Sequence, residues 1–259
     1  MLRKIKSILL FLLFKIPLNL KFVKSIELLI FNHQGKAWGS ETIKDEVNAC
    51  LYLLNKKPTV FIDIGVNKGL YTEYILKKFP DLESHLFEPS NLNYKILSDK
   101  FSLNKNIILN NIGLSNSNSK GILYSDTYGS GLASVTKRRL DHLNINLDQK
   151  EEINLIRFDE YWEKDQLIDY VKIDVEGHEL DVLNGFGELI YKTKLIQFEF
   201  GGCNIDTRTF FQDFWYFFLE KNFNIYRITP RGVLKINQYE ENMECFITTN
   251  FIAINNNLL

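Results

Sequence analysis

The chain contains few cysteines, few prolines and almost no net charge. Its three cysteines lie far apart in 259 residues and form no C-x-x-C pair, which argues against a disulfide framework and against a structural zinc site. The 31 Lys and Arg residues nearly balance the 32 Asp and Glu residues, so the chain lacks the basic excess of a domain that binds nucleic acid. Five prolines beside 20 phenylalanines exclude a disordered chain. We therefore expect a compact domain of the kind found in the reducing cytoplasm, with no nucleic-acid partner.

The N-terminal segment lacks both a membrane-spanning run and acidic residues. Residues 8–14 are continuously apolar, but Lys15 and Pro17 end this run, whereas a spanning helix needs about 20 apolar residues. No small-x-small cleavage site follows, as a signal peptide would require. Six basic residues precede the first acid, Glu27. Two interpretations of residues 1–30 stay open: a helical cap packed on the main domain, or a basic amphipathic segment on the cytoplasmic face of an anionic membrane.

Strand-like and helix-like patterns alternate along most of the chain. This alternation predicts right-handed βαβ units, and hence an α/β fold with a seven-stranded, mostly parallel sheet and helices on both faces. Strands predicted at residues 224–228 and 245–254 are joined by a loop, so one of them is expected to run antiparallel. The apolar runs that predict the parallel strands lie at residues 60–64, 84–87, 107–114, 170–175 and 195–200.

No linker rich in Pro, Gly or Ser divides the chain. We expect residues 1–55 to form an N-terminal helical extension, with one helix near residues 41–54, and residues 56–259 to form a single domain. Periodicity is weak from about residue 116 to residue 152, which predicts a loop-rich insertion. An insertion of this length inside a compact domain is usually functional or mobile.

A glycine-bearing turn follows the first predicted strand of the sheet. The string Asp63-Ile64-Gly65-Val66-Asn67-Lys68-Gly69 departs from the G-x-G-x-x-G dinucleotide fingerprint and carries an acid two residues before its first glycine. The glycines let the backbone approach a ligand, and the turn opens a helix whose N-terminus attracts anionic groups. An acid at this place is unfavourable for a diphosphate but suits the ammonium and sulfonium groups of S-adenosylmethionine (SAM). Glu88 lies 25 positions after Asp63 at the end of the second strand, where a carboxylate can bind both ribose hydroxyls; a loop cap and a surface charge are the structural alternatives for the two acids.

A second string places charged residues on a strand that is otherwise apolar. In Asp169-Tyr170-Val171-Lys172-Ile173-Asp174-Val175-Glu176-Gly177-His178-Glu179, residues two apart share a face, so Lys172, Asp174 and Glu176 line one side. A buried strand rarely carries three charges without mutual pairing or a ligand. Glu199, near the end of the next strand, adds a carboxylate at a similar height. We interpret the cluster either as part of a ligand site at the carboxyl edge of the sheet or as a structural ion-pair network.

With these strings in view, the chain resembles the FkbM family of SAM-dependent methyltransferases. Three blocks carry the resemblance, at residues 61–69, 87–89 and 172–179, with support from Gly113-Leu114-Ser115 and from residues 157–161. Val66 stands where the family usually has alanine, and residues 116–152 and both ends match no family pattern. The resemblance implies a Rossmann-like class I methyltransferase fold for residues 56–259, with SAM as the cofactor.

The resemblance also implies methyl transfer to oxygen, typically a hydroxyl of a sugar or of a natural product. We expect the acceptor to be a sugar, glycan or glycolipid, as in polysaccharide biosynthesis. A general base must then take the hydroxyl proton during an in-line displacement. The candidate catalytic residues are Asp174, His178 and Glu176, with Glu179 as a further carboxylate. The residues expected to bind the cofactor are Asp63, Gly65, Asn67, Gly69, Glu88, Asn111 and Asp174. Some sugar methyltransferases use Mg²⁺, and Asp174, Glu176 and Glu199 carry oxygen ligands, but we predict no metal site.

Two other functions stay open at this stage. An NAD(P)-dependent oxidoreductase would share the Rossmann-like fold but needs the G-x-G-x-x-G string, which is absent. A non-catalytic, membrane-associated protein would keep a degenerate methyltransferase fold, although Asp63, Glu88 and Asp174 are all present. The run Lys137-Arg138-Arg139 is either a solvated group of charges or a holder of an anionic acceptor. The sequence leaves the acceptor and the oligomeric state open.

Overall fold

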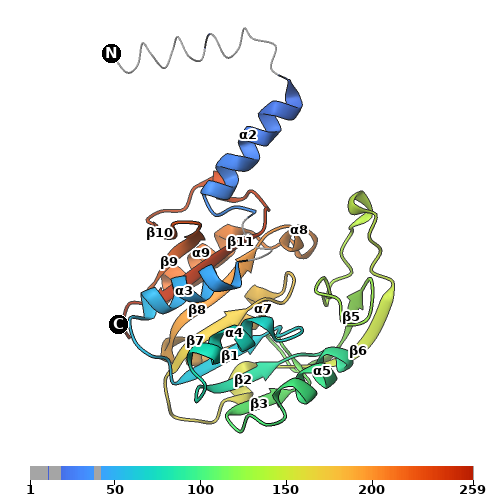
Figure 1. Ribbon diagram of the computed structural model, residues 1–259, viewed down its shortest axis with the longest axis vertical. Helices are drawn as coiled ribbons and strands as arrows, with labels where there is room; N and C mark the ends of the chain where they lie inside the picture. Colours follow the sequence, from blue (N-terminus) through green and yellow to red (C-terminus); the bar gives the residue numbers. More distant parts are fainter. Residues whose placement is uncertain (1–10, 12–18, 38–41, 259) are drawn as a thin grey trace.

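The central element of the molecule is an eight-stranded sheet with the order β10-β9-β11-β8-β7-β1-β2-β3 (Figure 1). The structure, a computed structural model, describes residues 11, 19–37 and 42–258. Five strands that are adjacent in the sheet pair in parallel with one another: β1 (Val60–Ile64), β2 (Glu83–Phe87), β3 (Ile107–Asn110), β7 (Ile168–Ile173) and β8 (Thr193–Phe200). The strands that complete it are β9 (Phe223–Thr229), β10 (Gly232–Ile236) and β11 (Thr249–Asn255).

The middle strands are buried on both faces because their sequences are apolar almost throughout. Every residue of β1, β7 and β11 is buried, as expected for strands that helices cover on both sides. Side chains of β1 alternate between two cores: Ile62 and Ile64 face one, and Phe61 faces the other. The predicted α/β fold with a mostly parallel sheet is confirmed.

Helices cover both faces of the sheet. One core includes residues of α6 (Phe158–Tyr161), α7 (Glu179–Gly185) and α9 (Phe211–Glu220), and the other includes residues of α3 (Ile43–Leu54) and α4 (Leu70–Lys78). Helix α5 (Asn91–Phe101) packs beside β3. Shorter helices are α8 (Cys203–Thr207), η2 (Gly187–Lys192) and η3 (Glu241–Met243). Val47 and Cys50 of α3 share a core with Phe61, so α3 is a layer of the main domain although it lies within residues 1–55.

Two strands run against the others. β11 pairs antiparallel with β8 and with β9, and β10 pairs antiparallel with β9. One antiparallel strand was expected here, and β11 provides it. The sheet has eight strands instead of the predicted seven because the chain turns back after Pro230 to form β10. Most of this edge strand is exposed, so it lacks the apolar run that marks the inner strands.

The predicted insertion forms a second, smaller sheet beside the first (Figure 1). β5 (Ser119–Ser125) and β6 (Gln149–Ile156) pair antiparallel, and β6 also pairs with β4 (Gly113–Leu114). The expectation of a loop-rich insertion over residues 116–152 therefore holds only for its middle, which contains the short helix η1 (Asp141–Leu143). The first four residues of β6, residues 149–152, are all polar, which weakens the signal of a buried strand.

Helix α2 (Leu20–His33) projects away from the domain, and none of its residues is buried (Figure 1). A helical cap packed on the main domain is thus not what this helix forms. The rest of that segment, residues 1–10 and 12–18, lies outside the described residues. No helix in the described part of the chain is long and apolar enough to cross a membrane.

Candidate functional site

The turn after β1 depends on two glycines. Gly65 and Gly69 have φ angles of +81° and +74°, which other residues rarely adopt. A Cβ on Gly65 would lie 1.8 Å from the carbonyl oxygen of Asp174, and a Cβ on Gly69 would lie 2.7 Å from the side chain of Leu97. The turn is therefore pressed directly against the carboxyl end of β7, which joins the two strings that the sequence singles out.

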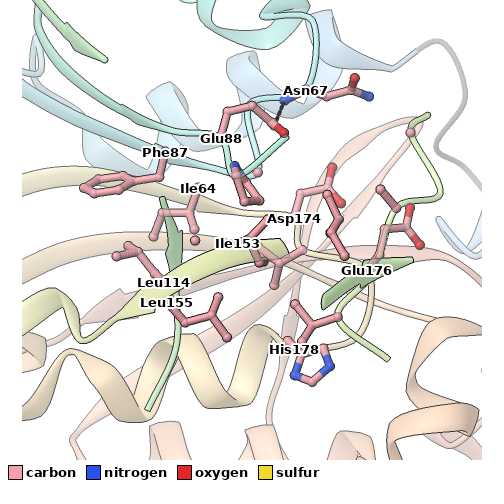
Figure 2. A pocket seen from close by; sticks show the side chains of 18 of the residues that line it. Ile64, Asn67, Phe87, Glu88, Leu114, Ile153, Leu155, Asp174, Glu176 and His178 are labelled. Carbon is pink, nitrogen blue, oxygen red and sulfur yellow. Dashed lines mark hydrogen bonds between the residues drawn. The ribbon is translucent and has the colours of Figure 1, made fainter. Parts of the chain in front are cut away.

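A cleft opens where these two strings meet, at the carboxyl edge at which α/β sheets bind ligands (Figure 2). It holds about 700 Å³ of empty space, part of it open to solvent. Both sheets contribute to its apolar wall, which includes Ile64, Phe87, Leu114, Leu123, Ile153 and Leu155. The polar lining residues are Asn67, Glu88, Ser130, Asp174, Glu176 and His178. The cleft thus combines a large apolar wall with a few polar groups, as ligand sites usually do.

Glu88 is fixed at this cleft by backbone donors. Its carboxylate accepts hydrogen bonds from the N–H groups of Asn67, at 2.7 Å, and Ser90, at 2.9 Å (Figure 2). Burial raises its pKa to about 7, although these two hydrogen bonds act in the opposite direction. Carboxylate oxygens can accept more than one hydrogen bond each, so Glu88 can still receive a pair of hydroxyl donors from a ligand.

Two predicted cofactor-binding residues support the cleft and do not line it. Gly69 caps helix α4 and packs against Leu97. Asn111 donates from its amide to the carbonyl oxygens of Glu88, at 3.0 Å, and Pro89, at 3.1 Å. Asn111 therefore holds the loop that carries Glu88.

Asp63 does not face the cleft. Its carboxylate is fully buried, accepts a hydrogen bond from the Thr72 hydroxyl and lies 4.0 Å from the Lys172 ammonium. Burial raises its pKa, and the charge of Lys172 opposes this rise. Because strand side chains alternate, Asp63 and Ile64 point to opposite faces, and it is Ile64 that lines the cleft. The structure thus gives no support to the predicted contact between Asp63 and the cofactor and places Asp63 in a structural ion pair.

Lys172 connects this buried pair to the cleft. Its ammonium lies 3.0 Å from Asp174 Oδ2 and 5.1 Å from the centre of the Tyr71 ring. Burial lowers the pKa of Lys172, but the carboxylates of Asp174, Asp63 and Glu46 outweigh it and leave the pKa raised. Asp174 keeps 38% of its side chain exposed and lines the cleft, so it is the member of this group that a ligand can reach.

Glu176 lies in the turn after β7 and is paired with Arg138 of the insertion. Arg138 also lies 3.8 Å from Asp206, and only 9% of its side chain is exposed. Burial raises the pKa of Glu176 to about 8, with a further rise from Asp174 and a lowering effect from Arg138. Because Arg138 is turned inward between two carboxylates, it is not available to hold an anionic acceptor.

His178 is held between a carboxylate and a hydroxyl. Its Nδ1 lies 3.0 Å from Asp181 Oδ2, and its Nε2 lies 2.8 Å from Thr136 Oγ1. Since a carboxylate can only accept, Nδ1 carries the proton toward Asp181, and Nε2 accepts from the hydroxyl. This is the arrangement of an imidazole base oriented by a carboxylate, with a hydroxyl where the base takes its proton.

Sequence reasoning missed Asp181 and Thr136, and it did not pair Arg138 with Glu176. Asp181 follows His178 by three positions on a helix, a spacing that places both on one side. Thr136 and Arg138 come from the irregular part of the insertion, where no periodic pattern marks them. Nearby residues of the insertion, Ser130, Gly131, Ala133 and Val135, line the cleft.

Two predicted carboxylates lie outside the cleft wall. Glu179 is fully buried and accepts hydrogen bonds from the N–H groups of Val175 and Gly177, both at 3.1 Å, so it shapes the turn. Glu199 is not a lining residue of the cleft. Within residues 11, 19–37 and 42–258, no group of three or more His, Cys, Asp or Glu side chains is arranged to hold a metal ion.

Known proteins that the chain is similar to are methyltransferases. Residues 63–225, more than half of the chain, match the family model described as Methyltransferase FkbM domain. The chain is 28% identical over 170 residues to Methyltransferase sdnD of Sordaria araneosa, a match that covers 54% of this chain and 65% of that relative. The plantazolicin methyltransferase BpumL, solved with S-adenosylhomocysteine (SAH), has a TM-score of 0.48 and 12% identity, covering 83% of this chain and 86% of its own. A SAM-dependent O-methyltransferase of Thermotoga maritima has a TM-score of 0.41 and 10% identity, covering 82% and 64% of the two chains.

Proposed function

The chain belongs to the FkbM family of SAM-dependent methyltransferases, and we propose that it methylates a hydroxyl oxygen of a sugar within a glycan or glycolipid. The proposal rests on one observation about the cleft. Glu88 lies at one end of its lining, and His178, an imidazole base with a hydroxyl against its Nε2, lies at the other end. Family membership also argues against the oxidoreductase alternative. The non-catalytic alternative makes a different prediction, which is the absence of any methylated product.

The residues of the cleft fit SAM. The apolar wall around Phe87 and Leu155 would hold the adenine, and Glu88 would accept the ribose hydroxyls. When bound, SAM supplies a methyl group on a positively charged sulfur. The Asp174 side chain lines the cleft, and its carboxylate favours that positive charge, a role that sequence reasoning gave to Asp63.

His178 is the general base in this proposal. Its Nε2 would accept the proton of the acceptor hydroxyl as that oxygen takes the methyl group that bound SAM would supply. Asp181 fixes the ring and stabilises the imidazolium that results. Thr136 marks the place at which Nε2 receives a hydroxyl.

Asp174 and Glu176 then have positioning roles. Each of these carboxylates is already paired with a cation, Lys172 for Asp174 and Arg138 for Glu176. The ion pairs occupy an oxygen of each carboxylate, whereas the Nε2 of His178 already faces a hydroxyl. We therefore assign proton transfer to His178 alone among the three predicted catalytic residues.

The test has two steps. Calorimetry with SAM and SAH should give measurable binding to the wild-type protein, and no heat with either ligand would refute the proposal. Incubation with labelled SAM and a cell-derived glycan and lipid extract, followed by mass spectrometry, should then show a methylated sugar. A methyl group found only on nitrogen or on protein would also count against it.

The role of His178 is tested with His178→Asn. This substitution should lower the methylation rate by a factor of about 10² to 10⁴ and leave SAH affinity unchanged. The matched control is His142→Asn, because His142 is an exposed histidine of helix η1. Equal rates for wild type and His178→Asn would assign the base to another residue.

We also propose that the enzyme acts on the cytoplasmic side of a membrane, which residues 1–30 contact. Cys50, Cys203 and Cys245 are unbridged, in keeping with a reducing compartment. The basic residues before Glu27 suit the anionic lipids of a cytoplasmic leaflet. Cell fractionation should recover the protein with membranes, and recovery only in the supernatant at low salt would contradict this.

A further inference from the structure

Helix α2 presents an apolar face that nothing in the described part of the molecule covers. Phe22, Ile26, Leu29 and Ile30 follow the spacing of residues on one side of a helix. Their exposed fractions are 59%, 44%, 71% and 48%, although side chains of this size are usually buried when a helix packs on its own domain. A continuous exposed apolar face of this kind marks an interaction surface.

The opposite side of the same helix carries two lysines together with Leu28, which is 52% exposed. Lys21 and Lys24 lie there by helical spacing, and both are exposed. Six of the chain's 31 basic residues precede the first acid, which leaves 25 basic against 32 acidic residues in the rest of the chain. A cationic segment is therefore attached to an anionic domain, and its partner is expected to be anionic.

Helix α2 leaves the domain at the edge of the sheet that carries the cleft. Lys36, just after the helix, forms a β-bridge with Thr249, and Ala37 donates from its N–H to the carbonyl oxygen of Thr248 at 2.8 Å. Thr249 is paired with Phe200, the last residue of β8. Because β8 runs parallel to β7, this is the same edge at which Asp174, Glu176 and His178 lie.

We propose that α2 docks on an anionic phospholipid bilayer, with Phe22, Ile26, Leu29 and Ile30 in the lipid and Lys21 and Lys24 at the headgroups. The structure of a basic amphipathic helix suits the boundary between headgroups and acyl chains. Because α2 joins the domain at the edge of the sheet that carries the cleft, docking of the helix holds the cleft near the membrane. The acceptor is then a glycan attached to a lipid of that membrane, a conclusion that rests on the function proposed above, whereas the docking itself does not.

Charge distribution favours a bilayer over a second copy of the chain. A second copy that paired through the apolar face of α2 would cover those apolar side chains but leave Lys21 and Lys24 on the outer sides without an anionic partner. An anionic bilayer satisfies the apolar face and both lysines at once, and each lysine adds to the attraction. The domain itself is acidic and is repelled by such a surface, so α2 is the part that makes the contact.

The direct test is sedimentation of the full-length protein with phosphatidylglycerol vesicles, with phosphatidylcholine vesicles for comparison. We expect binding to the anionic vesicles that weakens strongly at high salt. The double variant Phe22→Ser/Leu29→Ser should bind at least about tenfold more weakly, because two apolar side chains no longer enter the lipid. The double variant Lys21→Gln/Lys24→Gln should also lose about tenfold on anionic vesicles.

Leu103→Ser is the matched control, because Leu103 is 95% exposed and lies after α5, outside α2. It should bind vesicles like the wild type. Since no residue of α2 is buried, every variant should unfold at the wild-type temperature, so lost binding cannot come from misfolding. Unchanged binding of Phe22→Ser/Leu29→Ser would overturn the docking proposal. The proposal would also be overturned if the wild type did not bind the vesicles and instead formed a dimer in analytical ultracentrifugation that the Phe22→Ser/Leu29→Ser variant dissociates.

The acceptor is tested with the lipid extract before and after mild acid releases its glycans. Phe22→Ser/Leu29→Ser should methylate the lipid-attached glycans at least about tenfold more slowly than wild type and the released glycans at the same rate. If the variant methylated the lipid-attached glycans as fast as the wild type does, and the released glycans likewise, the proposal of a lipid-attached acceptor would be refuted. SAH binding without vesicles reports on the cofactor site separately, so its loss and the loss of docking are distinguishable.

Discussion

Two groups of charged residues share one stretch of sequence and lie in different environments. Lys172 and Glu179 are buried and bonded within the protein, and Asp63 joins them from another strand. Asp174 and His178 lie between these positions in sequence but line the cleft. The charged string therefore borders the cleft, but the burial of each side chain decides which charges a ligand can meet.

The two groups should also differ in what they stabilise. A buried charge that loses its partner destabilises the folded state, because the remaining charge is left without water or a counter-ion. A charge on the cleft wall keeps access to solvent, so its removal changes binding or catalysis first. Substitutions in the two groups can thus be ordered by the expected size of their effects, and each one tests the distinction between buried charges and cleft-facing charges.

Replacement of Lys172 by methionine should have the largest effect. Asp63 and Asp174 would lose their common cation, and Asp63 is fully buried, so we expect a loss of about 3–5 kcal/mol in the free energy of unfolding. Denaturant unfolding measures it. The matched control is Lys192→Met, which breaks the exposed ion pair of Lys192 with Asp165 and should change stability little. Similar unfolding of both variants would show that the buried cluster is not structural.

Replacement of Asp63 by asparagine should separate stability from cofactor binding. Asparagine keeps the shape and a partner for Thr72 but removes the charge that faces Lys172, so stability should fall by about 1–3 kcal/mol. SAH affinity, measured by calorimetry, should stay within about threefold of wild type, because Asp63 does not reach the cleft. In contrast, Asp174→Asn should weaken SAM more than SAH, since only SAM carries the sulfonium charge. A large loss of SAH affinity in Asp63→Asn with intact folding would return Asp63 to the cofactor site.

Much of the fold follows from the sequence because its signals are local. The apolar runs at β1 and β7 and the glycine turn after β1 are set by strand burial and by φ angles that only glycine adopts readily, and both are readable without coordinates. The edge strand β10 was missed because exposed residues interrupt its apolar pattern. Its place in the sheet depends on its pairing with β9 in the hairpin, and the residues of β10 alone do not show that pairing.

The candidate site was predicted in part, and the misses have a common cause. Glu88, Asp174, Glu176 and His178 line the cleft as predicted from their places at strand ends. Asp63 was assigned to the ligand because sequence spacing alone does not say which face of β1 borders the cleft. Thr136 was missed, and the pairing of Arg138 with Glu176 was not predicted, because these contacts cross about 40 positions of sequence from an insertion without periodicity.

Cofactor affinity should depend on pH through Glu88. Its pKa is raised to about 7, so it is largely protonated at pH 6 and ionised at pH 8. If the ionised form accepts the ribose hydroxyls, SAH should bind about tenfold more tightly at pH 8 than at pH 6. The sign is opposite for the empty protein, because a raised acid pKa makes the contribution of Glu88 to stability fall as the pH rises from about 4.5 through 7. In Glu88→Gln this pH dependence of SAH affinity should vanish. Its persistence there would assign the titration to another group.

The smallest expected effect comes from Thr136→Val, which removes the hydroxyl against His178 and keeps the side-chain volume. If Thr136 only marks the place of the acceptor hydroxyl, the acceptor replaces it during turnover, and kcat should change by no more than about fivefold. If Thr136 instead relays the proton, the loss should approach that of His178→Asn, because both break one chain of proton transfer. Ser134→Ala is the control, since Ser134 donates to the carbonyl oxygen of Glu176 at 2.8 Å and anchors the same segment without touching His178. A large loss in Thr136→Val with a wild-type rate in Ser134→Ala would therefore make the insertion part of the proton path, and the cleft-facing group would then extend beyond the charged residues that the sequence reveals.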